Sequence, residues 1–375
     1  MVDKVALSVA VIALIVAAVS LTYNPSLMRS QEELNTRLSD LEKRIPKEPV
    51  EEDLVAAARR EASTGPLVMY GVMDLSDVIG IVWPAFKAKY PFAPEVQYIE
   101  GFTELRQRFQ EEAARGVRTA DVRLQDGGDA FSDLGKGLGL RFESKSDSLY
   151  QSDQIVDKTL RHAWGNVGVI IYNTNLVKEA DAPKSWFDLA NPKWNGSIAT
   201  ADPRLDGTSR DMYADLIQTL GENRVRQLFK EAYIDNRARV LNDWGSSVYN
   251  SVLAGEHAIG TSLINDVVQQ KSGAPVAAAK LTEGVPITRT FAYVYANTPR
   301  PNLAKLFVEW FTSEEGQTKV GVTGRVPALR TLDSPSSLKN ILPGVSAMPS
   351  NLDNYRNPDT WLQKFKDMFR EIGIP

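Results

Sequence analysis

The chain contains no cysteine among its 375 residues. Disulfides, thiolate zinc sites, cysteine nucleophiles and lipids attached to cysteine are therefore excluded. Only two histidines are present, His162 and His257, and no Gly-x-Ser-x-Gly, His-Glu-x-x-His or phosphate-loop spacing occurs. These absences leave few groups for nucleophilic or acid–base catalysis and argue against an enzyme.

Basic residues are not in excess either: 43 lysines and arginines stand against 47 acidic residues, for a formal net charge of -4. No basic stripe is visible that could neutralise a run of phosphates, so we expect no nucleic-acid partner. A composition of 43% hydrophobic and 24% charged residues is typical of a globular protein. The length is sufficient for two packed lobes.

One uncharged apolar run, Val5 to Leu21, follows Lys4 near the N-terminus. As a helix rising about 1.5 Å per residue it would reach roughly 25 Å, near the lower limit for crossing a bilayer. Ala18-Val19-Ser20 also offers a small-residue cleavage site, so a membrane anchor and a signal peptide both stay open. In either case we expect the protein at the cell surface or in the periplasm, anchored if the run is retained and secreted if it is cleaved.

The segment after the apolar run predicts a helical stalk. Apolar residues recur at spacings of three, four and seven between residues 27 and 45, which indicates a short heptad helix. An isolated amphipathic helix is the alternative, because Gln31 interrupts the seam. Pro46 ends this helix, a second charged helix is predicted at residues 51–62, and the turn at residues 63–66 marks the expected edge of the folded domain.

From Leu67 onward, short β-rich segments alternate with helical patterns. Such alternation predicts an α/β fold with a largely parallel sheet covered by helices. The predicted strands are residues 67–72, 95–100, 120–124, 167–174, 198–201, 257–263 and 290–298. The predicted helices include residues 105–114, one that begins at 208, 222–231, 247–254, 303–311 and 314–320.

Six segments together resemble the ABC-transporter extracellular solute-binding proteins of family 1, which include the ferric-iron and phosphonate binders. In chain order they are GVIIYNTNLV, PKSWFDLANPKWNGSIATADP, DGTS, AGEHAIGTSLIND, KSGAPVAAAKLTEGVP and PNLAKLFVEWFTSEEGQ. The resemblance covers about residues 67–330. It implies a two-lobed periplasmic-binding-protein-like (type II) fold with two crossover strands and a ligand in the cleft between the lobes. It also implies delivery of that ligand to a membrane permease driven by a cytoplasmic ATPase.

The resemblance and the apolar run together predict five segments. They are an anchor or signal segment at 1–25, a stalk at 26–65, the first part of lobe 1 at 66–168, lobe 2 at 169–288, and a return segment at 289–375 that completes lobe 1 and carries C-terminal helices.

Four polar loops follow predicted strands. Ligands of open α/β sheets collect at the carboxyl ends of strands, where helix N-termini present N–H groups and positive dipole ends. Helix capping is the alternative for each loop, and Thr208 with Asp211 has the spacing of a capping pair. The residues assigned to the site are Met73, Asp74, Asp126, Gly127, Thr208, Ser209, Arg210, Asn265 and Asp266.

Three residues outside those loops are further candidates. Trp244 and Ser246 precede a helix start and could stack on or hydrogen-bond a ligand, with a half-buried core tryptophan as the alternative. Arg289, near the second crossover, is a second possible anion partner or a surface ion pair. Ferric-binding relatives carry adjacent tyrosines where this chain has Val267 and Val268, so we expect no directly held iron(III), no other metal and no cofactor.

Acidic residues combined with Arg210 suit a zwitterion, a polyol or a phosphorylated polyol. The predicted function is therefore a membrane-tethered component of an ABC importer that captures a small polar solute, anionic or zwitterionic, between two lobes. A membrane-anchored sensing receptor is the first alternative, although only Met1 to Lys4 precede the apolar run and we expect no output domain there. An enzyme of the same fold is the second.

Overall fold

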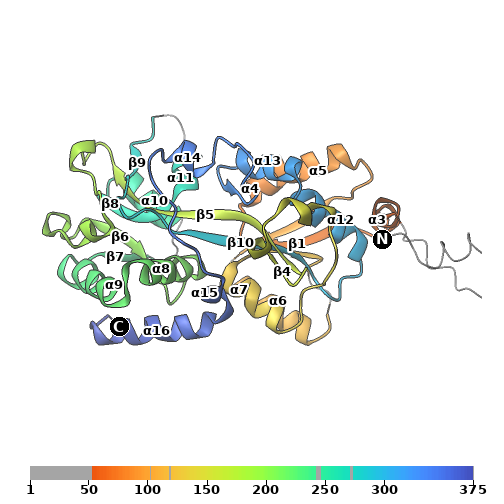
Figure 1. Cartoon of the computed structure of the whole chain (residues 1–375), viewed down its shortest axis with the longest axis horizontal. Coiled ribbons are helices and arrows are strands. Elements are labelled where there is room, and N and C mark those ends of the chain that lie inside the picture. Colours follow the sequence, from red (N-terminus) through yellow and green to blue (C-terminus); the bar gives the residue numbers. More distant parts are fainter. Residues whose placement is uncertain (1–52, 102, 118–119, 242–245, 271–272, 375) are drawn as a thin grey trace, which may run out of the picture. The chain divides into compact units, whose positions relative to one another are not determined.

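The computed structural model describes residues 53–101, 103–117, 120–241, 246–270 and 273–374 (Figure 1). The chain divides into two compact units, residues 1–53 and 54–375, and the second is described below. The predicted apolar helix at residues 5–21 and the heptad stalk lie outside the described residues. Within the described ranges, no helix combines the length and apolar character needed to cross a membrane.

The second unit is built on one mixed sheet with the order β2-β1-β3-β10-β5-β8-β6-β7, and β4, β9 and β11 pair with β5. β1 runs parallel to β2 and β3, β6 runs parallel to β7 and β8, and β10 runs antiparallel to both β3 and β5. The predicted α/β class is confirmed, but the prediction of a largely parallel sheet is wrong, because every strand that pairs with β5 or β10 runs antiparallel to it. The strands are β1 (Leu67–Gly71), β2 (Val96–Glu100), β3 (Val122–Asp126), β4 (Ile155–Val156), β5 (Leu160–Asn173), β6 (Ile198–Ala201), β7 (Arg239–Leu241), β8 (Ile259–Leu263), β9 (Val276–Ala278), β10 (Ile287–Val294) and β11 (Val326–Pro327).

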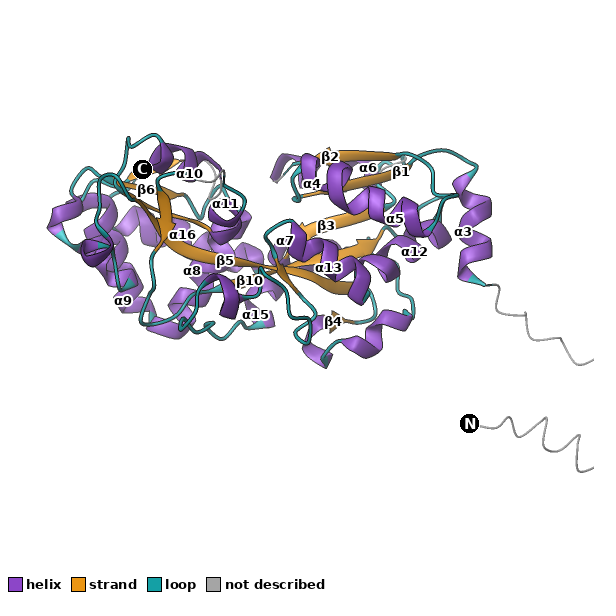
Figure 2. Cartoon of the chain, turned by 90° about the horizontal axis from the view of Figure 1, so that it is seen from above, coloured by secondary structure: helices purple, strands orange, loops and turns teal. Residues whose placement is uncertain are grey.

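The long strand β5 connects two groups of strands. Its first half pairs with β4, β10 and β11, and its second half pairs with β8 and β9. We call β1 to β3 with their helices lobe 1, and β6 to β9 with theirs lobe 2; Figure 2 shows β5 and β10 running between them. The predicted lobe boundaries, after residues 168 and 288, fall within these two strands and stay predictions.

The helices of lobe 1 include one that precedes the predicted domain edge. Helix α3 packs on α12, where Asn302 and the backbone N–H of Leu303 donate to Glu61 over 2.7 and 2.8 Å. Ala58 of α3 is fully buried in the same core as Phe307 of α12. The helices are α3 (Leu54–Ala62), α4 (Leu75–Asp77), α5 (Trp83–Lys89), α6 (Thr103–Ala114), α7 (Gly127–Gly135), α12 (Pro301–Phe311) and α13 (Glu314–Val322).

Lobe 2 has its own core, to which the C-terminal helix contributes. Phe365 and Phe369 of α16 pack edge-on or tilted against Phe229, with ring centroids 6.3 and 5.6 Å apart. Burying these rings fixes α16 on lobe 2. The other helices of lobe 2 are α8 (Gly207–Leu220), α9 (Glu222–Phe229), α10 (Ser246–Leu253), α11 (Ile264–Val268), α14 (Leu338–Ile341) and α16 (Pro358–Glu371). Helix α15 (Leu352–Arg356) contacts helices of both lobes.

Candidate functional site

Two of the predicted loops, one from each lobe, meet in a hydrogen bond. Asp126 ends β3 in lobe 1, and Thr208 lies in the first turn of α8 in lobe 2. Oγ1 of Thr208 donates to Oδ2 of Asp126 over 2.8 Å, and both residues are buried. Oγ1 of Thr290, on β10, donates to the other carboxylate oxygen over 3.3 Å. The candidate site therefore lies where β3 ends, α8 begins and β10 passes between the lobes.

The N-cap of α8 is Asp206, so the alternative in which Thr208 caps this helix is wrong. The Asp206 carboxylate accepts hydrogen bonds from the backbone N–H groups of Thr208 and Ser209 over 3.1 and 3.2 Å. The Ser209 hydroxyl donates back to the Asp206 backbone oxygen over 3.1 Å. Aspartate caps a helix at least as well as threonine, so Asp206 of the Asp-Gly turn is the capping residue. The Thr208 hydroxyl is then left for Asp126, and two of the first N–H groups of α8 are already occupied.

Arg210 brings a positive charge to the site. The residue is 7% exposed, and its Nη2 lies 3.8 Å from Oδ1 of Asp129 on α7. That carboxylate oxygen also accepts a hydrogen bond from Nη1 of Arg106 over 2.6 Å. Nε of Arg210 is buried and has no hydrogen-bond partner among the described residues. A buried donor without a partner is costly, so this N–H group favours an oxygen atom supplied by a bound solute.

Four carboxyl groups lie around these guanidinium groups: Asp126, Asp129, Asp206 and Asp211. Burial, together with the nearby Asp206 and Asp129 carboxylates, raises the pKa of Asp126 to about 7, although the hydrogen bonds from Thr208 and Thr290 lower it. Burial also raises the pKa of Asp206, and it raises the pKa of Asp211 well above its usual value. A raised pKa means that the buried site favours the neutral form of the carboxyl group. An additional negative charge beside these three groups is therefore disfavoured. A solute that donates hydrogen bonds to the carboxyl groups would suit the site better than a bare anion.

The glycines after Asp126 have a packing role. A methyl group on Gly127 would lie 2.5 Å from Cδ1 of Tyr355, and one on Gly128 would lie 3.1 Å from Cβ of Pro358. The Gly128 N–H donates to Oδ2 of Asp211 on α8 over 3.3 Å, a second contact between the lobes. The pair therefore accommodates the C-terminal segment, and its presence is explained without a ligand.

The loop after β1 forms a separate group. The backbone oxygen of Met73 accepts a hydrogen bond from Tyr98 over 2.7 Å. Asp74 pairs with Nη2 of Arg325, whose Nη1 donates to Asp77 over 2.5 Å. Arg325 lies 251 residues beyond Asp74 in the chain, and it was not predicted from the sequence because no motif marks it. Among the described residues, no hydrogen bond joins this group directly to the candidate site.

The predicted loop residues of lobe 2 make local contacts. Nδ2 of Asn265 donates to Oδ1 of Asp266 over 3.3 Å, and the Ser262 hydroxyl donates to the other oxygen of Asp266 over 3.1 Å. Ser246 is exposed at the first position of α10. Trp244 lies outside the described residues. The roles of these residues in binding a solute stay predictions.

Arg289 has a protein partner. Its Nη1 and Nη2 donate to the backbone oxygen and to Oδ2 of Asp153 over 2.6 and 2.8 Å. The arginine is only 5% exposed, but the Asp153 side chain is 42% exposed, so the alternative of an ion pair at the surface fits the aspartate and not the arginine. Binding of an anion by Arg289 stays a prediction, and it would have to compete with Asp153.

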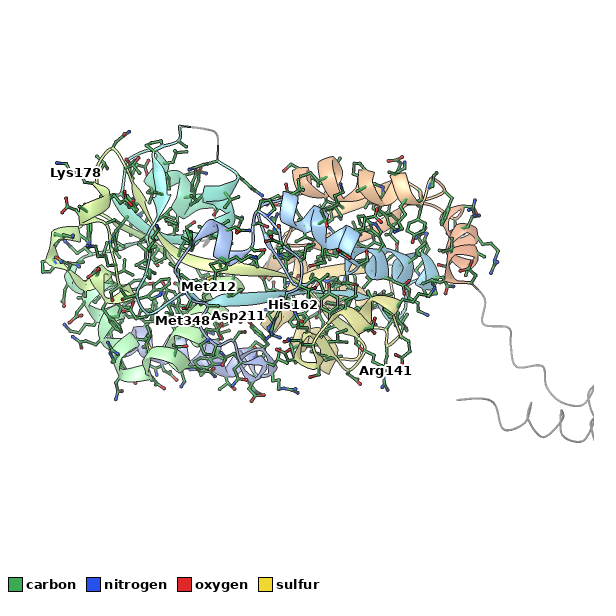
Figure 3. The ribbon with its side chains drawn as sticks, turned by 45° about the horizontal axis from the view of Figure 1, so that its top comes forward. Arg141, His162, Lys178, Asp211, Met212 and Met348 are labelled. Carbon is green, nitrogen blue, oxygen red and sulfur yellow. The ribbon has the colours of Figure 1, made fainter. Side chains whose placement is uncertain are left out.

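His162 lies on β5, in the half of that strand that pairs with β10 (Figure 3). Burial lowers its pKa to about 3, so the imidazole is neutral. Its Nδ1 accepts a hydrogen bond from Gln154 over 3.2 Å, and its Nε2 donates to the Trp164 backbone oxygen over 3.0 Å. Both ring nitrogens are thus used in packing lobe 1.

Residues 152–357, more than half of the chain, match a family model described as bacterial extracellular solute-binding protein. An uncharacterized protein of Haemophilus influenzae is 28% identical over 194 residues, which are 48% of this chain and 55% of that protein. A probable ABC transporter periplasmic-binding protein of Sinorhizobium fredii, y4fP, is 22% identical over 223 residues, or 56% of this chain and 60% of that protein. The matches thus span little more than half the length of these curated relatives.

Several solved structures share the fold. AfuA from Actinobacillus pleuropneumoniae, with exogenous fructose 6-phosphate bound, has a TM-score of 0.70 at 20% identity and covers 83% of this chain and 99% of its own. Iron-bound HitA from Pseudomonas aeruginosa has a TM-score of 0.65 at 18% identity, covering 82% and 99%. A periplasmic thiamin binding protein has a TM-score of 0.66 at 17% identity, covering 80% and 95%. The periplasmic-binding-protein fold predicted for this chain is confirmed by these likenesses.

Proposed function

The chain belongs to the bacterial extracellular solute-binding proteins, and on this basis we propose that it captures a small polar solute between its lobes and delivers it to the permease and ATPase of an ABC importer. The observation that carries the proposal is the buried hydrogen bond of 2.8 Å between Thr208 of lobe 2 and Asp126 of lobe 1. It joins the ends of elements where α/β folds bind ligands. Replacing such a contact with contacts to a solute would couple binding to the spacing of the lobes.

The proposed solute carries one acidic group and several hydrogen-bond donors, as an anionic polyol or a zwitterion does. The unpartnered Nε of Arg210 supports an acidic group there, because guanidinium groups bind carboxylate and phosphate oxygens well. The carboxyl groups of Asp126, Asp129 and Asp211 support hydroxyl or ammonium groups on the rest of the solute. AfuA, which has the same fold, was solved with fructose 6-phosphate bound, and a sugar phosphate has this combination of groups.

A directly held iron(III) ion is less compatible with this chain, even though HitA is an iron-bound relative in fold. Val267 and Val268 stand where the ferric-binding relatives carry adjacent tyrosines, and valine offers no oxygen ligand. The lack of tyrosine ligands at these positions therefore supports an organic solute over a directly held iron(III) ion.

A thermal-shift screen tests the proposed function. The full-length protein is screened against sugar phosphates, phosphonates, sugars, polyamines and ferric chelates. A true solute at 100 times its dissociation constant should raise the free energy of unfolding by about 2.7 kcal/mol. The stabilising compound should be recovered unchanged after prolonged incubation. Steady conversion of it by the purified protein would favour the enzyme alternative, and a screen without any stabilising class would count against capture.

We also propose that the apolar run at residues 5–21, which lies outside the described residues, holds the protein at the membrane. With no cysteine available for a lipid, this run is the expected tether. The intact mass of protein extracted from its native membrane should include these residues. A mature terminus at Leu21 would instead identify the run as a signal peptide and the protein as secreted.

A further inference from the structure

The short helix α15 lies between the two lobes on the side of α7 and α8 (Figure 1). It packs against α7 of lobe 1 and against α8 of lobe 2. These are the two helices whose first turns form the candidate site. Two consecutive residues of α15, Asn354 and Tyr355, make its principal contacts, and both are at most 1% exposed.

Tyr355 faces lobe 1. Its ring centroid lies 6.2 Å from that of Phe131 on α7 and 6.3 Å from that of Phe291 on β10. The ring also lies so close to Gly127 that a methyl group there would be 2.5 Å from Cδ1. The tyrosine oxygen accepts a hydrogen bond from the backbone N–H of Arg289 over 3.1 Å. One side chain therefore contacts both the start of α7 and a strand that runs between the lobes.

Asn354 faces lobe 2. Its Nδ2 donates to Oδ1 of Asp215 over 2.7 Å, and its Oδ1 accepts a hydrogen bond from Gln218 over 2.5 Å. Asp215 and Gln218 lie one and two turns along α8 from Asp211, on the same face of the helix. Asp211 contacts lobe 1 through the Gly128 N–H group. Asn354 therefore binds α8 on the same face that contacts lobe 1.

The backbone N–H of Arg289, which donates to Tyr355, lies beside an irregularity in β10. The pairing of β10 with β5 shifts register between Thr290 and Phe291. Thr290, next to Arg289, donates to the Asp126 carboxylate at the candidate site. Movement of α15 would therefore act on Asp126 by two routes, through β10 and through Gly127.

We propose that α15 is a brace between the lobes, in which Asn354 and Tyr355 are positioning residues that fix the spacing of α7 and α8 and so keep Asp126 within hydrogen-bond distance of Thr208. Neither residue belongs to the proposed solute contacts. The use of the brace in solute capture rests on the proposed function, but its effect on lobe spacing does not.

The test measures lobe spacing without any solute. Because the chain has no cysteine, Arg141→Cys and Lys178→Cys introduce the only two thiols for fluorescent labels. Both residues are exposed, and Figure 3 shows them on different lobes. Single-molecule energy transfer in the full-length protein then reports the distribution of interlobe distance. We expect one narrow distribution in the parent and a shifted or additional population in Asn354→Ala and in Tyr355→Phe.

Two matched variants separate spacing from stability. Asn236→Ala also removes a buried asparagine with two hydrogen bonds, but both go to backbone oxygens of lobe 2, at Leu189 and Asn191. Tyr150→Phe removes a hydroxyl that donates to the Thr312 backbone oxygen within lobe 1. These controls should lower the melting temperature and leave the distance distribution unchanged. Parent-like distributions in both brace variants would overturn the proposal, and Tyr355→Phe decides alone if Asn354→Ala does not fold. A failed solute screen would leave this result intact.

Discussion

Replacing Arg210 with alanine should weaken binding of the captured solute by roughly thirtyfold to several thousandfold, the equivalent of about 2 to 5 kcal/mol. The guanidinium is buried, and its Nε lacks a hydrogen-bond partner among the described residues. A solute oxygen placed there gains a charge-assisted hydrogen bond in a site from which water is largely excluded. Titration calorimetry with the compound found in the thermal-shift screen measures the change.

Arg204→Ala is the matched control for this prediction. Arg204 lies just before α8, whereas Arg210 lies in its first turn; Arg204 pairs with Asp202 over 2.7 Å and lies over the Phe369 ring, 4.7 Å from its centroid. Its removal should alter stability and leave solute affinity nearly unchanged. If Arg210→Ala folds and binds like the parent, the first turn of α8 is a capped helix start and nothing more.

The part of the free energy of unfolding that Asp126 contributes should fall as the pH rises from about 4 to 8. Burial raises its pKa from the usual 3.8 to about 7. Between these two values the folded protein holds a proton that the unfolded chain releases, so the stabilisation is complete below about pH 4 and is lost as the pH passes 7. Each tenfold change in an acid dissociation constant corresponds to about 1.4 kcal/mol, so a rise of the pKa from 3.8 to about 7 sets an upper limit of roughly 4 kcal/mol on this contribution.

Asp126→Asn isolates this contribution. Asparagine cannot ionise, yet it keeps an oxygen that can accept the hydrogen bond from Thr208. Asp206, Asp211 and the other buried carboxyl groups titrate in both proteins, so the difference between the two stability curves reports Asp126. In urea unfolding at several pH values, the free energy of unfolding of the variant should rise relative to that of the parent from pH 5 to pH 8. A constant difference over this range would mean that Asp126 is ionised throughout and that burial does not raise its pKa.

Much of the fold could be predicted from local sequence. The segment 198–201 coincides with β6, because a short uncharged run closed by an Asp-Pro turn has few alternatives. The predicted strand at 167–174, in contrast, covers only the second half of β5, which begins at Leu160. The first half contains Arg161, His162 and Asn166, which are all buried. Because these residues are polar, this half lacks the apolar pattern by which a buried strand is predicted from sequence. Their partners are supplied by the tertiary structure, which periodicity does not reveal.

The loops of the candidate site could be predicted from the sequence, but the distant residues that contact the predicted loops could not. The Asp126 and Thr208 loops both follow buried strands, which local pattern identifies. That Asp206 caps α8 could have been found from the Asp-Gly turn, since aspartate in this position is a common cap. The pairing of Arg325 with Asp74 and the packing of Tyr355 on Gly127 join positions more than 200 residues apart. No local signal indicates such contacts.

Mass spectrometry of the small molecules released when the purified, full-length protein is denatured tests the central claim most directly. If the protein captures a solute between Asp126 and Thr208, a single polar compound with an acidic group and hydroxyl or amine groups should be released in stoichiometric amount. The same compound should be absent or strongly reduced in Arg210→Ala and present in Arg204→Ala. Equal release from both variants, or a stoichiometric apolar compound or bare metal ion instead, would contradict the account.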